Sequence, residues 1–73
     1  SEQRYMRALA EYGPGAHKTG LVAKLLGSTT SKQSKIREAL IAKGMIYVPA
    51  RGVVEFTVPL FDQFMTRMMP TLE

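Results

Sequence analysis

Cysteine is absent from this chain, and histidine occurs only once, as His17. Without cysteine there is no basis for a disulfide framework, a thiolate metal site or a cysteine nucleophile. His17 has neither a Ser/His/Asp set nor a set of metal ligands beside it in the sequence. The six acidic residues are scattered over different predicted elements, and no pair is spaced for general acid–base catalysis. We therefore expect no enzymatic activity, cofactor or metal ion in this chain.

Long apolar runs are also lacking. None approaches the roughly 20 residues that a helix needs to cross a bilayer, and the first residues, Ser1 to Arg4, do not resemble a signal peptide. We therefore expect a cytoplasmic protein without a membrane partner. Because the chain begins without Met, we also expect it to be an excised piece of a longer protein.

Residues 13–19, which read Gly-Pro-Gly-Ala-His-Lys-Thr, superficially resemble a phosphate-binding loop. Such a loop requires glycine directly before the Lys-Thr pair and a β-strand leading into it. Here His17 stands in place of that glycine, and the segment follows a predicted helix. The pattern therefore does not indicate a nucleotide site.

Length and composition predict one small globular domain over residues 1–73. The chain is 45% hydrophobic and 22% charged, and it has no low-complexity tract. A chain of this size has no room for a second domain and must be stabilised by a compact, well-patterned core.

Positive charge is concentrated in the middle of the chain. The net charge is +4, yet residues 18–51 alone carry seven basic side chains against one acid, Glu38, and so reach +6, whereas the remainder sums to −2. This asymmetry is typical of a surface for an anionic partner. A solvated surface whose charges cluster by chance is the alternative. The seven basic residues are Lys18, Lys24, Lys32, Lys35, Arg37, Lys43 and Arg51.

Apolar periodicity predicts three helices in the first 44 residues. Residues 2–12 form an amphipathic helix with Arg7 off its apolar stripe, and a glycine-containing loop then runs through Lys18. Thr19 is the expected N-cap of a second helix that ends at Gly27. After a short turn, a third helix is expected from about residue 31 to residue 43, with Gln33, Ile36 and Leu40 facing inward. The aliphatic stem of Arg37 is a further candidate for the inward side, which leaves the facing of Arg37 open.

The period then changes from about 3.6 to about 2, which marks the change from helix to strand. Strands are predicted at residues 45–49 and 53–58, joined by a tip at residues 50–52. Pro59 is expected at the first position of a final helix whose broad apolar face includes Leu60. The inward strand residues are expected to be Ile46, Val48, Val54, Phe56 and Val58.

This order of elements is typical of a winged helix-turn-helix, an α+β and mostly helical fold with three helices, a two-stranded hairpin called the wing, and a C-terminal helix. In such a domain the third helix enters the major groove of DNA and the wing touches the flanking backbone. The sequence therefore predicts a module that binds double-stranded DNA.

The third helix and the wing supply most of the predicted DNA-binding residues. Lysine and serine suit phosphates and specify sequence only weakly, whereas Arg37 is the main candidate for a bidentate base contact. Arg51, at the tip, is expected to contact the backbone or the minor groove. The alternatives are an ordinary amphipathic helix with a lysine-rich wet side, simple turn chemistry at Arg51, and a solubility charge at Lys18. The full set is Ser31, Lys32, Ser34, Lys35, Arg37, Arg51 and Lys18.

The final helix is more apolar than one side of a small domain usually needs. Part of its apolar face is expected to pack on the first helix. The rest of that face, which is rich in methionine, suits a homodimer interface or another protein partner. A purely core-packing role is the alternative. The residues concerned are Phe61, Phe64, Met65 and Met68. They support a second hypothesis, a protein-interaction or regulatory domain.

Several segments resemble the C-terminal winged-helix domain of prokaryotic AAA-type ATP-binding proteins. They are residues 4–10, residues 43–47, residues 51–62, and Phe64 with Met65. The most distinctive part is residues 56–65, which read Phe-Thr-Val-Pro-Leu-Phe-Asp-Gln-Phe-Met. The resemblance implies that an ATPase domain of the same protein is a partner and binds ATP, and that no nucleotide-contacting residue lies in this chain. It leaves both DNA binding and a docking role open.

Overall fold

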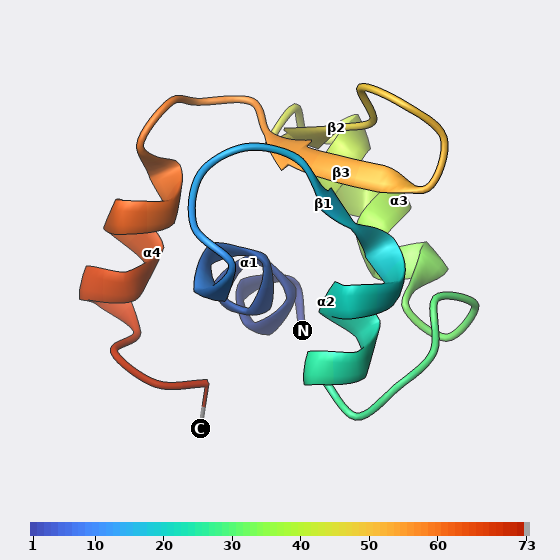
Figure 1. Cartoon of the computed structure of the whole chain (residues 1–73), viewed down its shortest axis with the longest axis horizontal. Coiled ribbons are helices and arrows are strands. Elements are labelled where there is room, and N and C mark those ends of the chain that lie inside the picture. The colour runs from blue at the N-terminus through green and yellow to red at the C-terminus, as the bar shows by residue number, and fades with distance from the viewer. Residues whose placement is uncertain (73) are drawn as a thin grey trace.

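The computed structural model describes residues 1–72, which form four helices and a three-stranded antiparallel sheet (Figure 1). In chain order the elements are α1 (Glu2–Glu11), β1 (His17–Lys18), α2 (Thr19–Leu25), α3 (Ser34–Ala42), β2 (Ile46–Tyr47), β3 (Val53–Phe56) and α4 (Phe61–Met68). About half of the described chain is helical. The predicted α+β class is confirmed.

The sheet is built around β3, in the order β1-β3-β2. On one side Lys18 pairs with Val53, and on the other Tyr47 pairs with Glu55. The amide of Thr19 donates to the carbonyl of Gly52 at 3.0 Å, which extends the contact between β1 and the β2–β3 turn. The sequence analysis placed residues 17–18 in a loop, and this was wrong because the partner of β1 lies far along the chain.

Helix α1 lies between α4 and α2 with the sheet above it, so it contacts all three other helices (Figure 1). Its side chains Tyr5, Ala8 and Leu9 are almost fully buried. They pack against one or more apolar side chains from each of the other helices and from the sheet. The core cluster consists of Tyr5, Met6, Ala8, Leu9, Ala10, Val22, Leu26, Leu40, Ile46, Val54 and Met65.

Arg7 is also buried, with 5% of its surface exposed, although the periodicity put it off the apolar stripe. Its guanidinium donates to the carbonyls of Met69 and Pro70, which follow α4, and forms an ion pair with Glu11 at 2.9 Å. Because α4 covers this side of α1, the long side chain of Arg7 holds the end of α4 against α1.

The starts of α2 and α3 differ from the prediction. Thr19 is the first residue of α2 and not its N-cap, and its hydroxyl and amide both face the carbonyl of Gly52. Helix α3 begins at Ser34 and not near residue 31, because residues 30–33 form turns first. The connection between α2 and α3 therefore covers residues 26–33 and is longer than predicted. Leu40 is buried as expected, whereas Gln33 and Ile36 are only partly buried.

The strands are shorter than predicted, and α4 begins later. Val48 and Val58 lie outside the strands and are about half exposed, so their predicted inward orientation was wrong. Pro59 precedes α4, whose N-cap is Leu60 with a left-handed φ of 67°. The Leu60 side chain is 67% exposed and does not join the apolar face of α4.

Candidate nucleic-acid interface

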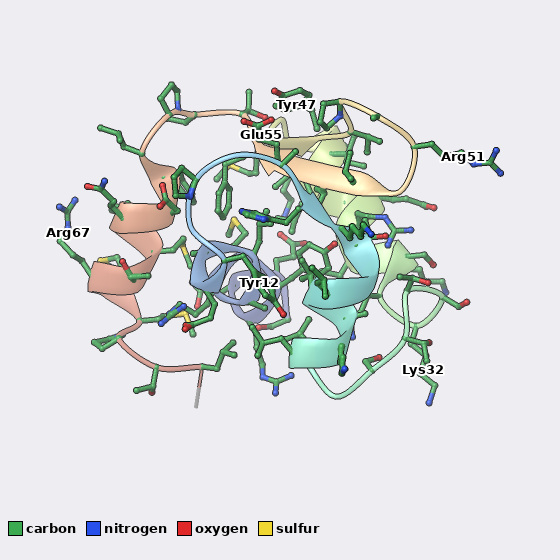
Figure 2. All side chains as sticks on the ribbon, in the orientation of Figure 1. Tyr12, Lys32, Tyr47, Arg51, Glu55 and Arg67 are labelled. Atoms are coloured by element: carbon green, nitrogen blue, oxygen red, sulfur yellow. The ribbon has the colours of Figure 1, made fainter. Side chains whose placement is uncertain are left out.

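The turn before α3 and the β2–β3 turn lie on the same side of the molecule (Figure 1). Lys32 extends into solvent from the first turn and Arg51 from the second, whereas Arg67 extends from α4 on the opposite side (Figure 2). All three side chains are exposed. The structure thus places two predicted residues that are 19 positions apart in the sequence on one side of the molecule, toward its two ends.

Lys18 lies beside the turn that carries Arg51. It pairs with Val53 in the sheet, and the next residue, Thr19, donates to the carbonyl of Gly52. Lys18 and Arg51 are both exposed. The short strand β1 therefore fixes Lys18 next to the β2–β3 turn, an arrangement that sequence periodicity did not reveal.

Hydrogen bonds shape the turn that carries Ser31 and Lys32. The amide of Lys32 donates to the Thr29 hydroxyl at 3.2 Å. The Ser34 hydroxyl donates to the carbonyl of Ser31 at 2.8 Å. These contacts hold Lys32 and Lys35 at the N-terminal end of α3 with both side chains exposed. Ser31 is exposed as well, and Ser34 is partly buried.

Arg37 is engaged by groups of the protein itself. Its guanidinium donates to the carbonyl of Thr30 at 3.4 Å and lies near the phenol of Tyr5. Burial raises the pKa of the Tyr5 phenol, and the positive charge of Arg37 partly offsets that rise. The side chain is partly buried, so in this conformation its guanidinium is engaged by Thr30 and Tyr5.

The positive charges on this side of the domain are not neutralised by ion pairs with acidic side chains. In the described chain, Lys43 pairs with Glu2 at 2.7 Å and Arg7 pairs with Glu11, whereas the exposed residues Lys18, Lys24, Lys32, Lys35 and Arg51 form no ion pair. The one acid among residues 18–51, Glu38, is exposed on α3 one turn after Lys35. We call the surface of Lys18, Lys32, Lys35 and Arg51 the basic face.

A groove of about 370 Å³ lies at the other end of β2 and β3, where β3 leads into α4. Its walls include Glu55 and Asp62, which the sequence analysis treated as scattered acids. The Tyr47 hydroxyl donates to Glu55 Oε1 at 3.0 Å (Figure 2), and this bond to a carboxylate raises the pKa of the Tyr47 phenol. No sequence signal marked the groove, because its residues meet only after the β3–α4 connection has folded.

A second groove, of about 300 Å³, is lined by residues of α1 and α4 where the two helices pack together. Of the predicted partner-binding residues, Met65 is buried and Phe61 partly buried, whereas Phe64 and Met68 are exposed at 42% and 65%. The groove is lined by Gln3, Met6, Phe61, Phe64, Met65, Met68 and Met69. Helix α4 thus contributes both to the core and to an exposed apolar surface.

The described residues include neither a cluster suited to a metal ion nor a helix suited to cross a membrane. Among residues 1–72, no three or more His, Asp or Glu side chains are grouped so as to hold a metal ion. No helix within the same range has the length and apolar character needed to cross a membrane.

One family matches this sequence. The profile of a domain of unknown function, DUF8462, matches residues 1–65. This range contains every residue of the basic face and both acids of the groove. Comparison with curated proteins and with solved structures found no match.

Proposed function

Because the chain belongs to the DUF8462 family, whose description assigns no function, we propose from its own surface that it is a winged-helix module that binds the backbone of double-stranded DNA. In this proposal α2 and α3 are the helix-turn-helix and the β2–β3 turn is the wing. The module is a cytoplasmic, non-catalytic binding domain.

The observation that carries the proposal is the set of exposed cations without ion pairs. Lys32 and Arg51 extend from the same side of the domain (Figure 2), Lys18 pairs with Val53 beside the turn that carries Arg51, and Lys35 follows Lys32 by three positions at the start of α3. Phosphate groups are the commonest partners of such side chains in DNA complexes, because neutralising them releases counterions.

The order of elements supports the same proposal. A sheet in the order β1-β3-β2, with two helices between β1 and β2, puts the turn of the hairpin beside the start of α2. The first helix of the proposed helix-turn-helix and the hairpin turn thus lie together, and α3 follows as the helix proposed to enter the major groove. The connection at residues 26–33 is longer than the 3–4 residues of a simple helix-turn-helix.

Weak sequence preference follows from the chemistry of this surface. Lysine contacts phosphate as a point charge and reads bases poorly, whereas Arg37 would have to leave Thr30 and Tyr5 to reach a base. Glu38 adds a negative charge to the exposed side of α3. The domain therefore positions itself on DNA without strong selection of a target sequence.

A second candidate function is a protein-interaction domain that docks through α4. The exposure of Phe64 and Met68 beside the α1–α4 groove favours it, because exposed apolar patches with adaptable methionine are common at interfaces. The resemblance to AAA-type proteins suggests an ATP-binding ATPase domain of the same protein as the neighbour. A homodimer through the same surface is the other form of this candidate.

Arginine substitutions on opposite sides of the domain test the DNA-binding proposal. We expect Arg51→Ala to weaken binding to a duplex of mixed sequence about three- to tenfold, a loss of about 0.6–1.4 kcal/mol, because one phosphate contact is removed. Arg67→Ala is the matched control on α4 and should bind like the wild type. Fluorescence anisotropy at low salt measures both affinities.

Substitutions of basic and acidic residues at α3 should change DNA affinity in opposite directions. Lys32→Ala/Lys35→Ala should weaken binding further than Arg51→Ala does, whereas Glu38→Gln should strengthen it, because it removes the acid from the contact surface. Equal affinities of all these variants for DNA would overturn the proposal. If duplex DNA does not bind at all and Phe64→Glu abolishes self-association of a folded domain, the α4 candidate takes its place.

A further inference from the structure

The groove between the end of β3 and α4 contains an acid that lacks a partner. Asp62, in the first turn of α4, is only 9% exposed and lines this groove. Within residues 1–72, no hydrogen bond or ion pair reaches its carboxylate. Its carboxylate oxygens are not among the side-chain atoms shut off from solvent, so the unpartnered carboxylate is open to the groove and accessible to a charged ligand that enters there.

Glu55 adds a second negative charge to the same groove. It lies on β3 opposite Tyr47, and one of its oxygens accepts the Tyr47 hydroxyl while the residue remains partly exposed. This hydrogen bond holds the carboxylate at the groove (Figure 2). Two acids and no basic residue line the groove, so it is complementary to a cation.

The remaining walls are apolar. Phe56, Val58, Pro59 and Leu60 line the groove together with Pro14 from the loop after α1. Aromatic faces and apolar walls suit an organic cation, whose methylene groups pack while its charged end meets the carboxylates. A metal ion would need more ligands, and the described residues offer no group of three or more.

The volume of the groove and the exposure of its lining residues indicate which kind of organic cation it would hold. A volume of about 370 Å³ lies near the low end of ligand sites, which span roughly 300–1,000 Å³. At its mouth Tyr47, Val58 and Leu60 are exposed. A free amine would leave these apolar side chains uncovered, whereas the residues flanking a lysine or arginine in a peptide would cover them.

We propose that this groove is a binding site for a lysine or arginine side chain of a partner polypeptide, with Asp62 as the buried counter-ion and Glu55 as the charge at the rim. The site is separate from the basic face, since it lies at the end of the hairpin away from the turn that carries Arg51. The proposal of this binding site does not depend on whether the domain binds DNA.

NMR titration of the ¹⁵N-labelled chain tests the proposal with small probes. The peptides acetyl-Gly-Lys-Gly-amide and acetyl-Gly-Arg-Gly-amide should cause saturable amide shifts at Gly15, Thr57 and Asp62. Acetyl-Gly-norleucine-Gly-amide, which lacks the charge, should cause none at the same concentrations. n-Butylammonium should bind more weakly than the lysine peptide because it cannot cover the mouth of the groove.

Carboxylate variants complete the test. Asp62→Asn should weaken binding of the better peptide at least tenfold, and Glu55→Gln several-fold. Glu38→Gln, which removes an exposed acid on α3, should leave it unchanged. Circular dichroism and thermal melting check that each variant folds, and Glu55→Gln carries the test if Asp62→Asn does not fold.

Three results would overturn the proposal. One is amide shifts of similar size near every acidic residue of the chain, which would mean that negative charge attracts the peptides non-specifically. Another is equal binding by the wild type and the folded carboxylate variants. The third is binding of n-butylammonium without binding of either peptide, which would replace the polypeptide with a free amine as the occupant.

Discussion

At the scale of single residues, Arg7 shows how a charged side chain can serve the core. It leaves the middle of α1, and its guanidinium reaches the carbonyls of Met69 and Pro70 beyond the end of α4. Those carbonyls follow the last turn of a helix, where backbone acceptors lack intrahelical partners. The two carbonyls therefore stabilise the buried guanidinium of Arg7, and the guanidinium supplies the donors that these carbonyls would otherwise lack.

Replacing Arg7 tests this account. We expect Arg7→Met to lower the free energy of unfolding by about 2 kcal/mol, because methionine replaces the apolar stem but leaves both carbonyls without their donor. For a domain of this size that loss shifts the melting temperature by roughly 8–16 °C. Urea denaturation measures it.

Glu11→Gln separates the ion pair from the carbonyl contacts. Glu11 is exposed, so the loss of its pairing with Arg7 should change stability by less than about 0.5 kcal/mol. If Arg7→Met were as stable as the wild type, the hydrogen bonds to Met69 and Pro70 would have no role in fastening α4.

At the scale of elements, the start of α4 depends on Leu60. Its φ of 67° is the one positive value among the non-glycine residues described, and its carbonyl accepts from the amides of Gln63 and Phe64. A left-handed backbone costs a side-chain-bearing residue roughly 1–2 kcal/mol. This conformation turns the chain from β3 into α4.

Glycine at this position should relieve the strain. We expect Leu60→Gly to raise the free energy of unfolding by up to about 1 kcal/mol, because relief of strain exceeds the extra entropy that glycine loses on folding. The exposed side chain contributes little burial. Thermal denaturation monitored by circular dichroism measures the change.

The matched control is Val58→Gly, two positions earlier. Val58 is also exposed but has no positive φ, so glycine there should lower stability slightly. The same destabilisation in both variants would contradict a strained start of α4.

Elements with a long repeating pattern could be predicted from the sequence, whereas those set by distant contacts could not. The helix at residues 2–12 and the change to strands after Gly44 follow from side-chain periodicity. The two residues of β1 carry no period, and their pairing with Val53 and Val54 appears only in three dimensions. Helix α3 starts late because the Thr29 hydroxyl accepts from the amide of Lys32 and stabilises a turn first.

The candidate sites divide in the same way. Exposure of Lys32 and Arg51 could be anticipated because lysine and arginine in glycine- or serine-containing turns seldom find buried partners. The inward position of Arg37 depends on Tyr5 from α1, and the burial of Asp62 depends on how α4 turns after Leu60. Neither contact has a local signal.

At the scale of the whole molecule, the surface is divided by charge and by polarity. The basic face lies on the side of α3 and the hairpin turn (Figure 1), whereas the acidic groove and the apolar groove beside α1 are both lined in part by α4. If both proposals hold, this division leaves the DNA-binding face free when a partner polypeptide occupies the groove. The two sites are therefore expected to bind independently.

The salt dependence of duplex binding by the wild-type chain tests the DNA-binding claim most directly. If the four cations of the basic face each neutralise one phosphate, log Kd should rise with log salt concentration with a slope of about 3.6, a loss of roughly 150-fold in affinity between 50 and 200 mM salt. A slope near zero, or no binding at 50 mM salt, would contradict the account.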